Sequence, residues 1–344
     1  MDKLKFKLKI LTPLAITTGN KLLNNVDFFI DKNIIHFINF DKLLSKLSED
    51  KIILLSNYLE TDPSQINLNN FISVNDIPQI IKYSVSINNL NINNSNNVKE
   101  IIEHIKNYMN KENKVVYGVY IPSSSIKGAI RTSIIYSILK ENFQKYKDII
   151  IKDRNYWESK ILDTKDKKLL TYLKISDSNI IDASKALYVK NVILFNSSRR
   201  INEFIELIKE NTEFEISIDI DKLTNEVENK IEKDKKIIIQ KLKNFKLALY
   251  EFSKDLIQYE KLYFKKKNLM SVISKYEQLE KQNTPESPLI RIGRHTGKLS
   301  KTIILLLQNN QLNLPKVDLS LPKTRRLIEE NQNNFTPLGW VKLI

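Results

Sequence analysis

The sequence predicts an α+β protein, and three patterns in its 344 residues carry that prediction. Residues 3–10 alternate lysine with apolar side chains, which is typical of a strand with one buried face. Residues 126–139 repeat isoleucine at every fourth position, which is typical of an amphipathic helix. Residues 238–259 repeat apolar side chains in a four-three spacing, which indicates a longer helical segment.

The N-terminal domain is expected to span residues 1–165. Its first strand is followed by a second β-rich region, because apolar runs are separated there by turn-forming residues. The further elements expected here are a hairpin of residues 26–30 and 34–40, a helix capped by Asp41 and running to Leu47 or Leu59, an Asn-rich loop at 88–97, a helix at 98–109 that exposes His104, and a strand at 115–121.

The C-terminal domain is expected to span residues 166–344. It has no glycine before Gly293, so its first turns must depend on Asn, Asp and Ser. The expected elements are strands at 170–175, 186–195 and 213–220, a short helix beginning at Arg199 and Arg200, and a helical insertion at about 222–281. We expect the apolar seam of the insertion to pack within the chain, because about three heptads are few for a free coiled coil.

Composition limits the classes of function. The apolar fraction of 42% is that of a globular protein, and no run of about 18 apolar residues predicts a membrane span. The chain has no cysteine, which excludes disulfides and thiolate metal sites and is compatible with the cytoplasm. Its formal charge of +15 favours a polyanionic partner, although lysine is enriched throughout. Where the charge lies is therefore more informative than its sum.

The start of the helix at residues 121–139 is the first candidate site. Pro122 ends the preceding segment, and a helix N-terminus with free N–H groups and hydroxyls attracts anions. Lys127 and Arg131 lie one turn apart at this positive end, and Gly128 leaves room for a ligand. These residues predict a phosphate-binding site formed by Ser123, Ser124, Ser125, Lys127, Gly128 and Arg131. The alternative is a capped helix with two solvated basic residues.

The second candidate site is the glycine-rich segment 288–298. Two glycines free the backbone to approach a ligand, and basic side chains surround them; the residues are Arg291, Gly293, Arg294, His295, Gly297, Lys298 and Lys301. A nucleotide P-loop is excluded, because three residues separate the glycines and Leu299 follows the lysine. A loop that clamps an RNA backbone agrees better with this composition. The alternative is a basic surface turn.

Four stretches resemble one family. Residues 121–131, Ile-Pro-Ser-Ser-Ser-Ile-Lys-Gly-Ala-Ile-Arg, resemble the I-P-G-S-S-L-K-G-A-[IL]-R motif of the RAMP superfamily, the RNA-binding subunits of CRISPR effector complexes. Residues 288–298 are similar to its glycine-rich loop. Residues 176–178, and residues 322–326 with 337–341, resemble signatures of one branch, the head subunits of type III-A (Csm) complexes. After the first strand, Ala15 and Thr17 replace the family's histidine and glycine.

The resemblance implies two tandem ferredoxin-like (RRM-like) domains, the second with the helical insertion. It implies a non-catalytic subunit that binds the 3′ part of a guide RNA, caps the backbone filament at the head end and supports guide maturation, without a metal or cofactor. Its implied partners are the guide RNA (crRNA), the repeated RAMP backbone subunit, the small helical subunit and host trimming nucleases. The two candidate sites would hold RNA backbone, with Lys323, Arg325 and Arg326 as additional candidates.

Three rival functions remain open from the sequence. One is another RAMP subunit of a type III complex, and one is a basic scaffold unrelated to CRISPR. The third is a repeat-cleaving RAMP endoribonuclease. Such enzymes use a histidine or tyrosine general base, but His36 lies in a strand among Ile and Phe, where packing is expected. Asp27 resembles the aspartate with which the backbone subunit cuts target RNA, but it has no partner acid, base or metal ligand in view. We expect it to have a structural or RNA-positioning role.

Overall fold

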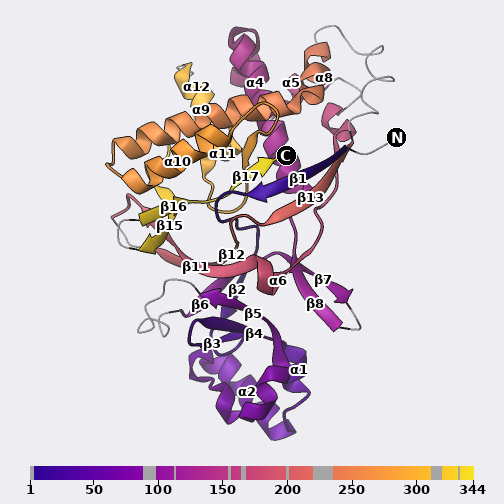
Figure 1. The fold of residues 1–344 in the computed structure, drawn as a ribbon, viewed down its shortest axis with the longest axis vertical. Helices are drawn as coiled ribbons and strands as arrows, with labels where there is room; N and C mark the ends of the chain where they lie inside the picture. The colour runs from indigo at the N-terminus through magenta and orange to yellow at the C-terminus, as the bar shows by residue number, and fades with distance from the viewer. Residues whose placement is uncertain are drawn as a thin grey trace.

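The computed structural model describes residues 4–87, 98–111, 114–153, 156–163, 168–198, 201–219, 235–310, 320–331 and 334–344. Three sheets and two groups of helices make up these parts (Figure 1). The domain boundary expected at residue 165 and the Asn-rich segment 88–97 lie outside the described residues. No helix in the described ranges is long and apolar enough to cross a membrane.

The terminal sheet contains both ends of the described chain, in the order β14-β17-β1-β13-β9. Its central strand β1 pairs antiparallel with β13 on one side and with β17 on the other. The expected alternation is confirmed in part of β1, since Leu8 and Ile10 are fully buried while Leu4 is 54% exposed. The strands are β1 (Leu4–Ile10), β9 (Lys174–Ile175), β13 (Glu213–Asp219), β14 (Leu289–Arg291) and β17 (Trp340–Leu343).

The second sheet has nine strands and lies below the terminal sheet in Figure 1. Its main path is β2-β6-β12-β11-β5-β4-β3, and β15 and β16 join it beside β11. The strands are β2 (Thr17–Leu23), β3 (Phe28–Asp31), β4 (Ile34–Ile38), β5 (Ile81–Ile87), β6 (Glu100–His104), β11 (Leu187–Phe195), β12 (Asn202–Ile208), β15 (Arg325–Asn331) and β16 (Asn334–Pro337).

A small third sheet has the strand order β10-β8-β7. Its strands β7 and β8 form a hairpin that projects beside the second sheet (Figure 1). It consists of β7 (Lys106–Lys111), β8 (Lys114–Val119) and β10 (Ile181–Asp182). Strand β8 lies where a strand was expected, and it leads into the central helix. The predicted hairpin of β3 and β4 is also confirmed, with Lys32 at its turn in the left-handed region at φ 53°.

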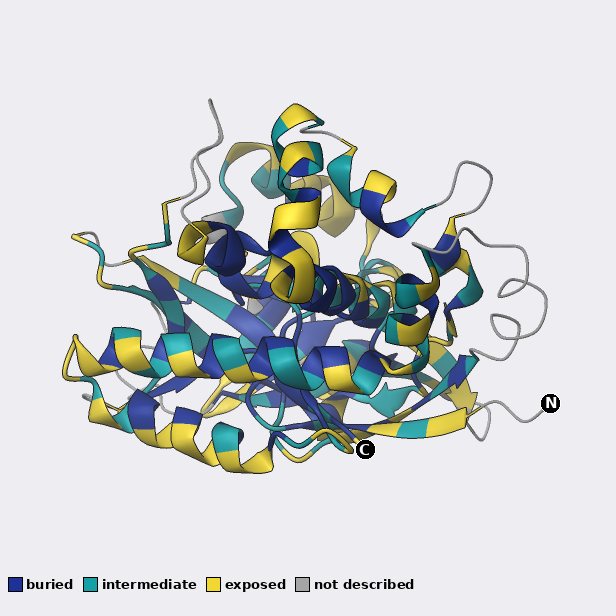
Figure 2. Cartoon of the chain, turned by 90° about the horizontal axis from the view of Figure 1, so that it is seen from above, coloured by how far each residue is buried: buried dark blue, intermediate teal, exposed yellow. Residues whose placement is uncertain are grey.

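Helix α4 (Ser123–Lys152) is the centre of the upper half of the molecule, and it confirms the helix predicted from residue 123 onwards. All residues from Ser133 to Leu139 are buried, because helices of the insertion also pack against α4. Figure 2 shows buried positions on the inner sides of the helices and exposed positions on their outer sides. The insertion contains α8 (Lys236–Lys243), α9 (Phe245–Lys265) and α10 (Met270–Gln282). Residues 220–234 lie outside the described parts.

The apolar seam of the insertion packs within the chain, as expected. Phe252 of α9 contacts Tyr136 of α4, with ring centroids 4.9 Å apart. The Tyr136 hydroxyl donates a hydrogen bond to Asp255 at 2.7 Å, and the Ser137 hydroxyl donates to Glu251 at 2.7 Å. Polar contacts thus fix the register of two helices that apolar burial brings together.

Short helices complete the fold. They are α1 (Phe40–Leu44), α2 (Glu49–Thr61), α3 (Ile77–Ile80), α5 (Trp157–Leu162), α6 (Ala183–Ala186), α11 (Lys298–Lys301) and α12 (Ile304–Asn309). The predicted cap at Asp41 is wrong by two residues, because the Asn39 side chain accepts from the Lys42 backbone N–H. The chain then forms two helices, with α2 beginning anew at Glu49.

The predicted helix at 98–109 is wrong, since these residues contribute to β6 and β7. Ile101 and Ile102 are both buried, because β6 lies between β2 and β12 and has both of its faces covered. The sequence favours a helix here because Val98, Ile101, Ile102 and Ile105 recur at helical spacing. His104 is consequently buried and not at the surface, and its burial lowers its pKa to about 3.

Two further predictions differ from the structure. Residues Leu169–Tyr172 form a 3₁₀ turn, and only Lys174 and Ile175 of the predicted strand at 170–175 are extended. A short helix was predicted to begin at Arg199 and Arg200, which lie outside the described residues, but strand β12 follows from Asn202. The strands predicted at 186–195 and 213–220 are confirmed as β11 and β13.

Candidate RNA-binding groove

The fold brings the two candidate sites together, although more than 150 residues separate them in the sequence. They line one hollow of about 550 Å³, which we call the groove. One wall is the beginning of α4, the other is the glycine-rich loop that follows β14, and the turn after β1 closes one end. The groove is lined by Ile16, Thr17, Ser124, Ser125, Gly128, Ala129, Arg131, Thr132, Arg291, Ile292, Gly293, Arg294, Ser300 and Lys301.

The segment 176–178 holds the start of α4 in place. The Asp177 carboxylate accepts a hydrogen bond from the Ser123 backbone N–H at 2.7 Å, and the Ser178 hydroxyl accepts from the Ile121 N–H at 2.9 Å. The predicted capping by serine hydroxyls is therefore wrong, because an aspartate distant in sequence supplies the cap. The hydroxyl groups of Ser124 and Ser125 remain on the wall of the groove.

Gly293 fixes the opposite wall against the turn after β1. The Arg294 backbone N–H donates a hydrogen bond to the Ala15 carbonyl oxygen at 2.7 Å. Gly293 has a φ of 96°, and a Cβ atom there would lie 2.3 Å from the same carbonyl oxygen. Only glycine allows this close approach. By contrast, a Cβ atom at Gly128 would meet nothing within 4 Å, so this glycine leaves space in the groove.

Three basic side chains, Arg131, Arg294 and Lys301, line the groove at its surface. Arg131 is exposed and forms an ion pair with Glu158. Lys301 has a lowered pKa, first because it is partly buried and then because Arg294 and Arg291 repel its charge. No acidic side chain of the described residues pairs with Lys301. The groove therefore concentrates positive charge that an anionic ligand would stabilise.

Glu203 of β12 organises the outer side of the glycine-rich loop. Its carboxylate lies 2.7 Å from His295 Nε2, 3.0 Å from Arg326 Nη2 and 3.7 Å from Arg294 Nη2. His295 has a φ of 65°, a conformation that this network holds in place. Burial lowers the pKa of His295 to about 4, although Glu203 acts in the opposite direction. At neutral pH His295 is therefore uncharged and contributes no positive charge to RNA binding.

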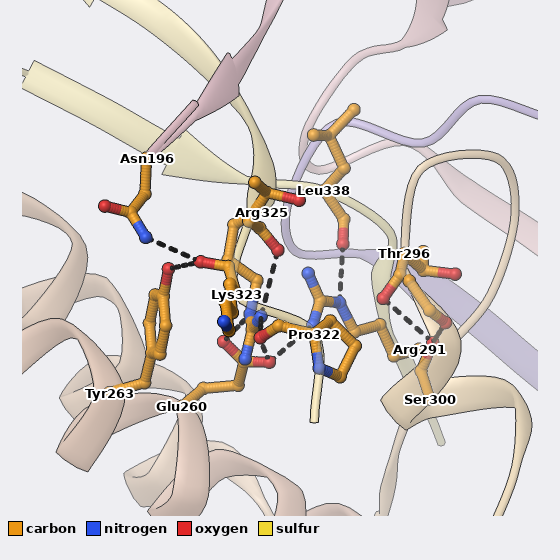
Figure 3. A network of polar contacts seen from close by, with 12 residues as sticks. Asn196, Glu260, Tyr263, Arg291, Thr296, Ser300, Pro322, Lys323, Arg325 and Leu338 are labelled. Carbon is orange, nitrogen blue, oxygen red and sulfur yellow. Dashed lines mark hydrogen bonds and ion pairs between the residues drawn. The ribbon is translucent and has the colours of Figure 1, made fainter. Parts of the chain in front are cut away.

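A buried carboxylate, Glu260 of α9, holds two of the predicted arginines (Figure 3). Arg325 Nε lies 2.8 Å and 3.0 Å from the two carboxylate oxygens of Glu260, and Arg291 Nη1 lies 3.7 Å from one of them. Arg291 Nε also donates to the Leu338 carbonyl oxygen at 3.1 Å. Although burial opposes the charged form of Arg325, Glu260 raises its pKa. These arginines connect the glycine-rich loop to the helical insertion.

Several predicted residues lie away from the groove wall. The Lys127 ammonium group donates to the Leu173 carbonyl oxygen at 2.9 Å, and Ser123 uses its N–H to bind Asp177. Lys323 is exposed on the far side of the Glu260 network, where its carbonyl oxygen accepts from Tyr263. Some of the predicted site residues line a second hollow behind the loop instead; they are His295, Gly297, Lys298, Arg325 and Arg326. Arg291 lines both hollows.

Some residues that line or support the groove are not marked by any sequence motif. Thr132 and Ser300 line the groove, and Glu203 and Glu260 position its arginines, yet each is an ordinary residue in its own segment. Only the pairing of distant strands brings these side chains to the glycine-rich loop. Asp177 does have a sequence signal, because the segment 176–178 that contains it resembles a family signature.

The residues considered for catalysis have structural contacts. Asp27 accepts a hydrogen bond from the Leu23 N–H at 2.8 Å, and its burial raises its pKa. His36 Nδ1 lies 2.8 Å from the Ser84 hydroxyl oxygen, and its ring stacks on Phe29 with centroids 4.9 Å apart. The expected packing role of His36 is thereby confirmed.

Comparison with known proteins shows where this architecture recurs. The model of the RAMP superfamily matches residues 7–298. Over 99% of its length the chain is 26% identical to a Methanocaldococcus jannaschii protein described as "CRISPR system Cms protein Csm5", of which it covers 88%. A chain in a cryo-EM structure of a type III-A Csm–crRNA–target RNA ternary complex has the same fold, with a TM-score of 0.74 at 23% identity, over 99% of this chain and 100% of that one. The crystal structure of T. onnurineus Csm5 gives a TM-score of 0.71 at 23% identity, over 97% and 99%.

Proposed function

This chain belongs to the RAMP superfamily, and from that premise we propose that it is a type III-A CRISPR effector subunit that binds the 3′ part of the guide RNA at the head end of the complex. The tandem ferredoxin-like fold with a helical insertion is confirmed by the family match and by the shared fold over the whole chain. The likeness to a Csm5 protein and to a chain of a Csm–crRNA complex supports an assignment to the Csm branch.

The groove is the observation that carries the proposal. It combines two motifs that lie far apart in the sequence, and it presents Arg131, Arg294 and Lys301 with serine and threonine hydroxyls and an open backbone at Gly128. Among the described residues that line it, none is aromatic. Recognition of RNA bases depends mainly on aromatic stacking and base-edge contacts, whereas this groove presents groups that bind phosphate and sugar. We infer that it holds RNA backbone with little base preference.

Gly128 provides a prediction with opposite effects on stability and binding. Gly128→Ala is expected to raise the free energy of unfolding by roughly 0.5–1 kcal/mol, because alanine favours the helix more than glycine does. The same methyl group enters the groove, so RNA affinity is expected to fall by a few-fold. Thermal unfolding and fluorescence anisotropy check the two effects. Gln144→Ala, on an exposed part of the same helix, should leave RNA affinity unchanged, and unaltered affinity of Gly128→Ala would show that RNA does not enter the groove.

The capping role follows from the geometry of filaments. A repeated RAMP backbone subunit stacks head to tail, and such a contact continues until one subunit lacks the second compatible face. In this chain, helices α9 and α10 add material to the upper half of the molecule, and their outward sides carry exposed Leu262 and Met270. We propose that the insertion covers the face on which a further backbone subunit would stack. The small helical subunit and host trimming nucleases are further proposed partners.

The number of copies per complex tests this role. We expect one copy per complex, at the end that holds the 3′ terminus of the guide, and ragged or altered guide 3′ ends in a strain that lacks it. Native mass spectrometry of the complex and sequencing of guide ends measure both. Two or more copies, or unchanged 3′ ends, would refute capping even if RNA binding held.

A repeat-cleaving endoribonuclease is the second candidate function, and the geometry does not favour it. Such an enzyme would require a histidine or tyrosine general base, and the three histidines are engaged elsewhere: His36 with Ser84, His104 in the core and His295 with Glu203. We propose that the subunit is not a nuclease. Incubating the purified chain with repeat RNA, with Mg²⁺ or with a chelator, tests this, since a specific cleavage product would contradict it.

A further inference from the structure

Behind the glycine-rich loop lies a second hollow of about 250 Å³, which we call the arginine cavity. The loop contributes residues 291–294 to the groove and residues 295–298 to the cavity, with Arg291 lining both. Gly297 and Lys298 are exposed and mark the open side of the cavity. Its deep part consists of side chains that are more than nine-tenths buried, namely Glu260, Arg291, Thr296, Leu299 and Arg325.

The charges that line this cavity are unbalanced. Arg291, Arg325, Arg326 and Lys298 are cationic, and Glu260 is the one carboxylate among the lining residues. Glu203 lies outside the cavity and already accepts from Arg326 and His295. When Glu203 is counted as well, the described residues in and beside the cavity have a net formal charge of +2, with His295 neutral. Burying several like charges is unfavourable unless anions accompany them.

Within the described part of the chain, three guanidinium nitrogens around the cavity are buried and have no hydrogen-bond partner. They are Nη1 of Arg291, Nη2 of Arg325 and Nη1 of Arg326. The Arg291 side chain is only 3% exposed, and the 3.7 Å from its Nη1 to Glu260 is too long for a hydrogen bond. Leaving a charged donor buried without a partner is unfavourable, so these N–H groups indicate a missing acceptor. Arginine forks bind oxyanions with several acceptor oxygens most strongly.

We propose that the arginine cavity binds a phosphate monoester, namely the terminal phosphate of the RNA strand that lies in the groove. This inference rests on the proposed RNA binding and extends it. A terminal phosphate has a charge of about −1.5 to −2 at neutral pH and three free oxygens, which match the excess charge and the unpartnered donors. An internal phosphodiester has one charge, and the RNA strand must continue out of the site on both sides of it. The exposed residues of the lining are the two neighbours Gly297 and Lys298, and an opening on one side favours the end of a strand.

RNAs of one sequence that differ only in their ends test the proposal. One has a 3′-phosphate, one has a 5′-phosphate and one has no terminal phosphate. We expect one of the phosphorylated RNAs to bind on the order of tenfold tighter than the unphosphorylated RNA. Equal affinities for all three would overturn this inference and leave RNA binding in the groove intact. If inorganic phosphate raised the melting temperature while all RNA ends bound alike, the cavity would hold free phosphate, which also overturns the proposal.

Two substitutions of opposite sign distinguish a phosphate site from a purely structural cluster. Lys298→Ala, at the exposed mouth, should reduce the advantage of the terminal phosphate about threefold. Glu260→Gln removes the negative charge and should enlarge that advantage several-fold, even if it lowers the melting temperature. If the cluster were purely structural, Glu260→Gln would lower the melting temperature without enlarging the advantage of the phosphorylated RNA. Lys267→Ala, an exposed lysine after α9, serves as the matched control and should change neither quantity.

Discussion

Replacing Arg131, Arg294 and Lys301 together by glutamine is expected to weaken RNA binding on the order of a hundredfold, if each phosphate contact contributes roughly 1 kcal/mol. The three side chains lie on both walls of one groove, so a single RNA strand would contact all of them. Each phosphate contact on single-stranded nucleic acid contributes about 0.7 to the salt dependence. The slope of log affinity against log salt should therefore fall by about 2.

Fluorescence anisotropy with labelled RNAs of different sequence measures both quantities. The loss should be the same for every sequence, because backbone contacts carry no base information. Lys145→Gln, at an exposed position of the same helix, controls for the general loss of positive charge. A triple variant with an unchanged salt slope, or with a loss confined to one RNA sequence, would contradict backbone recognition in the groove.

Glu260→Ala is expected to lower the free energy of unfolding by about 3–5 kcal/mol, the largest stability effect that the structure predicts for a single polar residue. The Glu260 side chain is 1% exposed, and its removal leaves Arg325 and Arg291 charged, buried and without their carboxylate. The effect should also reach the groove, because Arg291 begins the glycine-rich loop. Equilibrium unfolding in urea measures the change.

Two variants control this experiment. Glu277→Ala, an exposed glutamate on the neighbouring helix α10, should change stability by less than about 0.5 kcal/mol. Replacing both Glu260 and Arg325 by apolar residues of similar volume should cost less than Glu260→Ala alone, because one buried arginine, Arg291, and not two, then lacks its carboxylate. A Glu260→Ala variant as stable as Glu277→Ala would show that the network does not hold the loop.

The sequence predicted the secondary structure correctly where apolar residues repeat with one period over a long segment. The isoleucine stripe at 126–138 gave the start of α4, and the seam at 238–259 gave α8 and α9. The segment 98–109 was misassigned because Val98, Ile101, Ile102 and Ile105 recur at helical spacing, although β6 is a strand covered on both faces. His104 was misplaced with it, since its burial depends on strands β2 and β12, which are distant in the sequence.

The candidate site was predictable in part for the same reason. Residues that line the groove through their own segment, such as Gly128, Arg131 and Arg294, are visible as short motifs. Residues that position them from another element, such as Asp177 at the start of α4 or Glu260 beside Arg325, become apparent only in three dimensions. Lys127 is the opposite case. It belongs to the motif and lies on α4 as predicted, but its ammonium group donates to the Leu173 carbonyl oxygen and does not face the groove.

Photocrosslinking in a reconstituted complex tests the central claim, that this subunit holds the guide through the groove, most directly. The complex is assembled on a guide RNA with photoreactive nucleotides at defined positions, and the crosslinked peptides are identified by mass spectrometry. We predict crosslinks from the 3′ part of the guide to peptides that contain residues 121–132 and 291–301. Crosslinks to these peptides from the 5′ part alone, or crosslinks that avoid both peptides, would contradict the account.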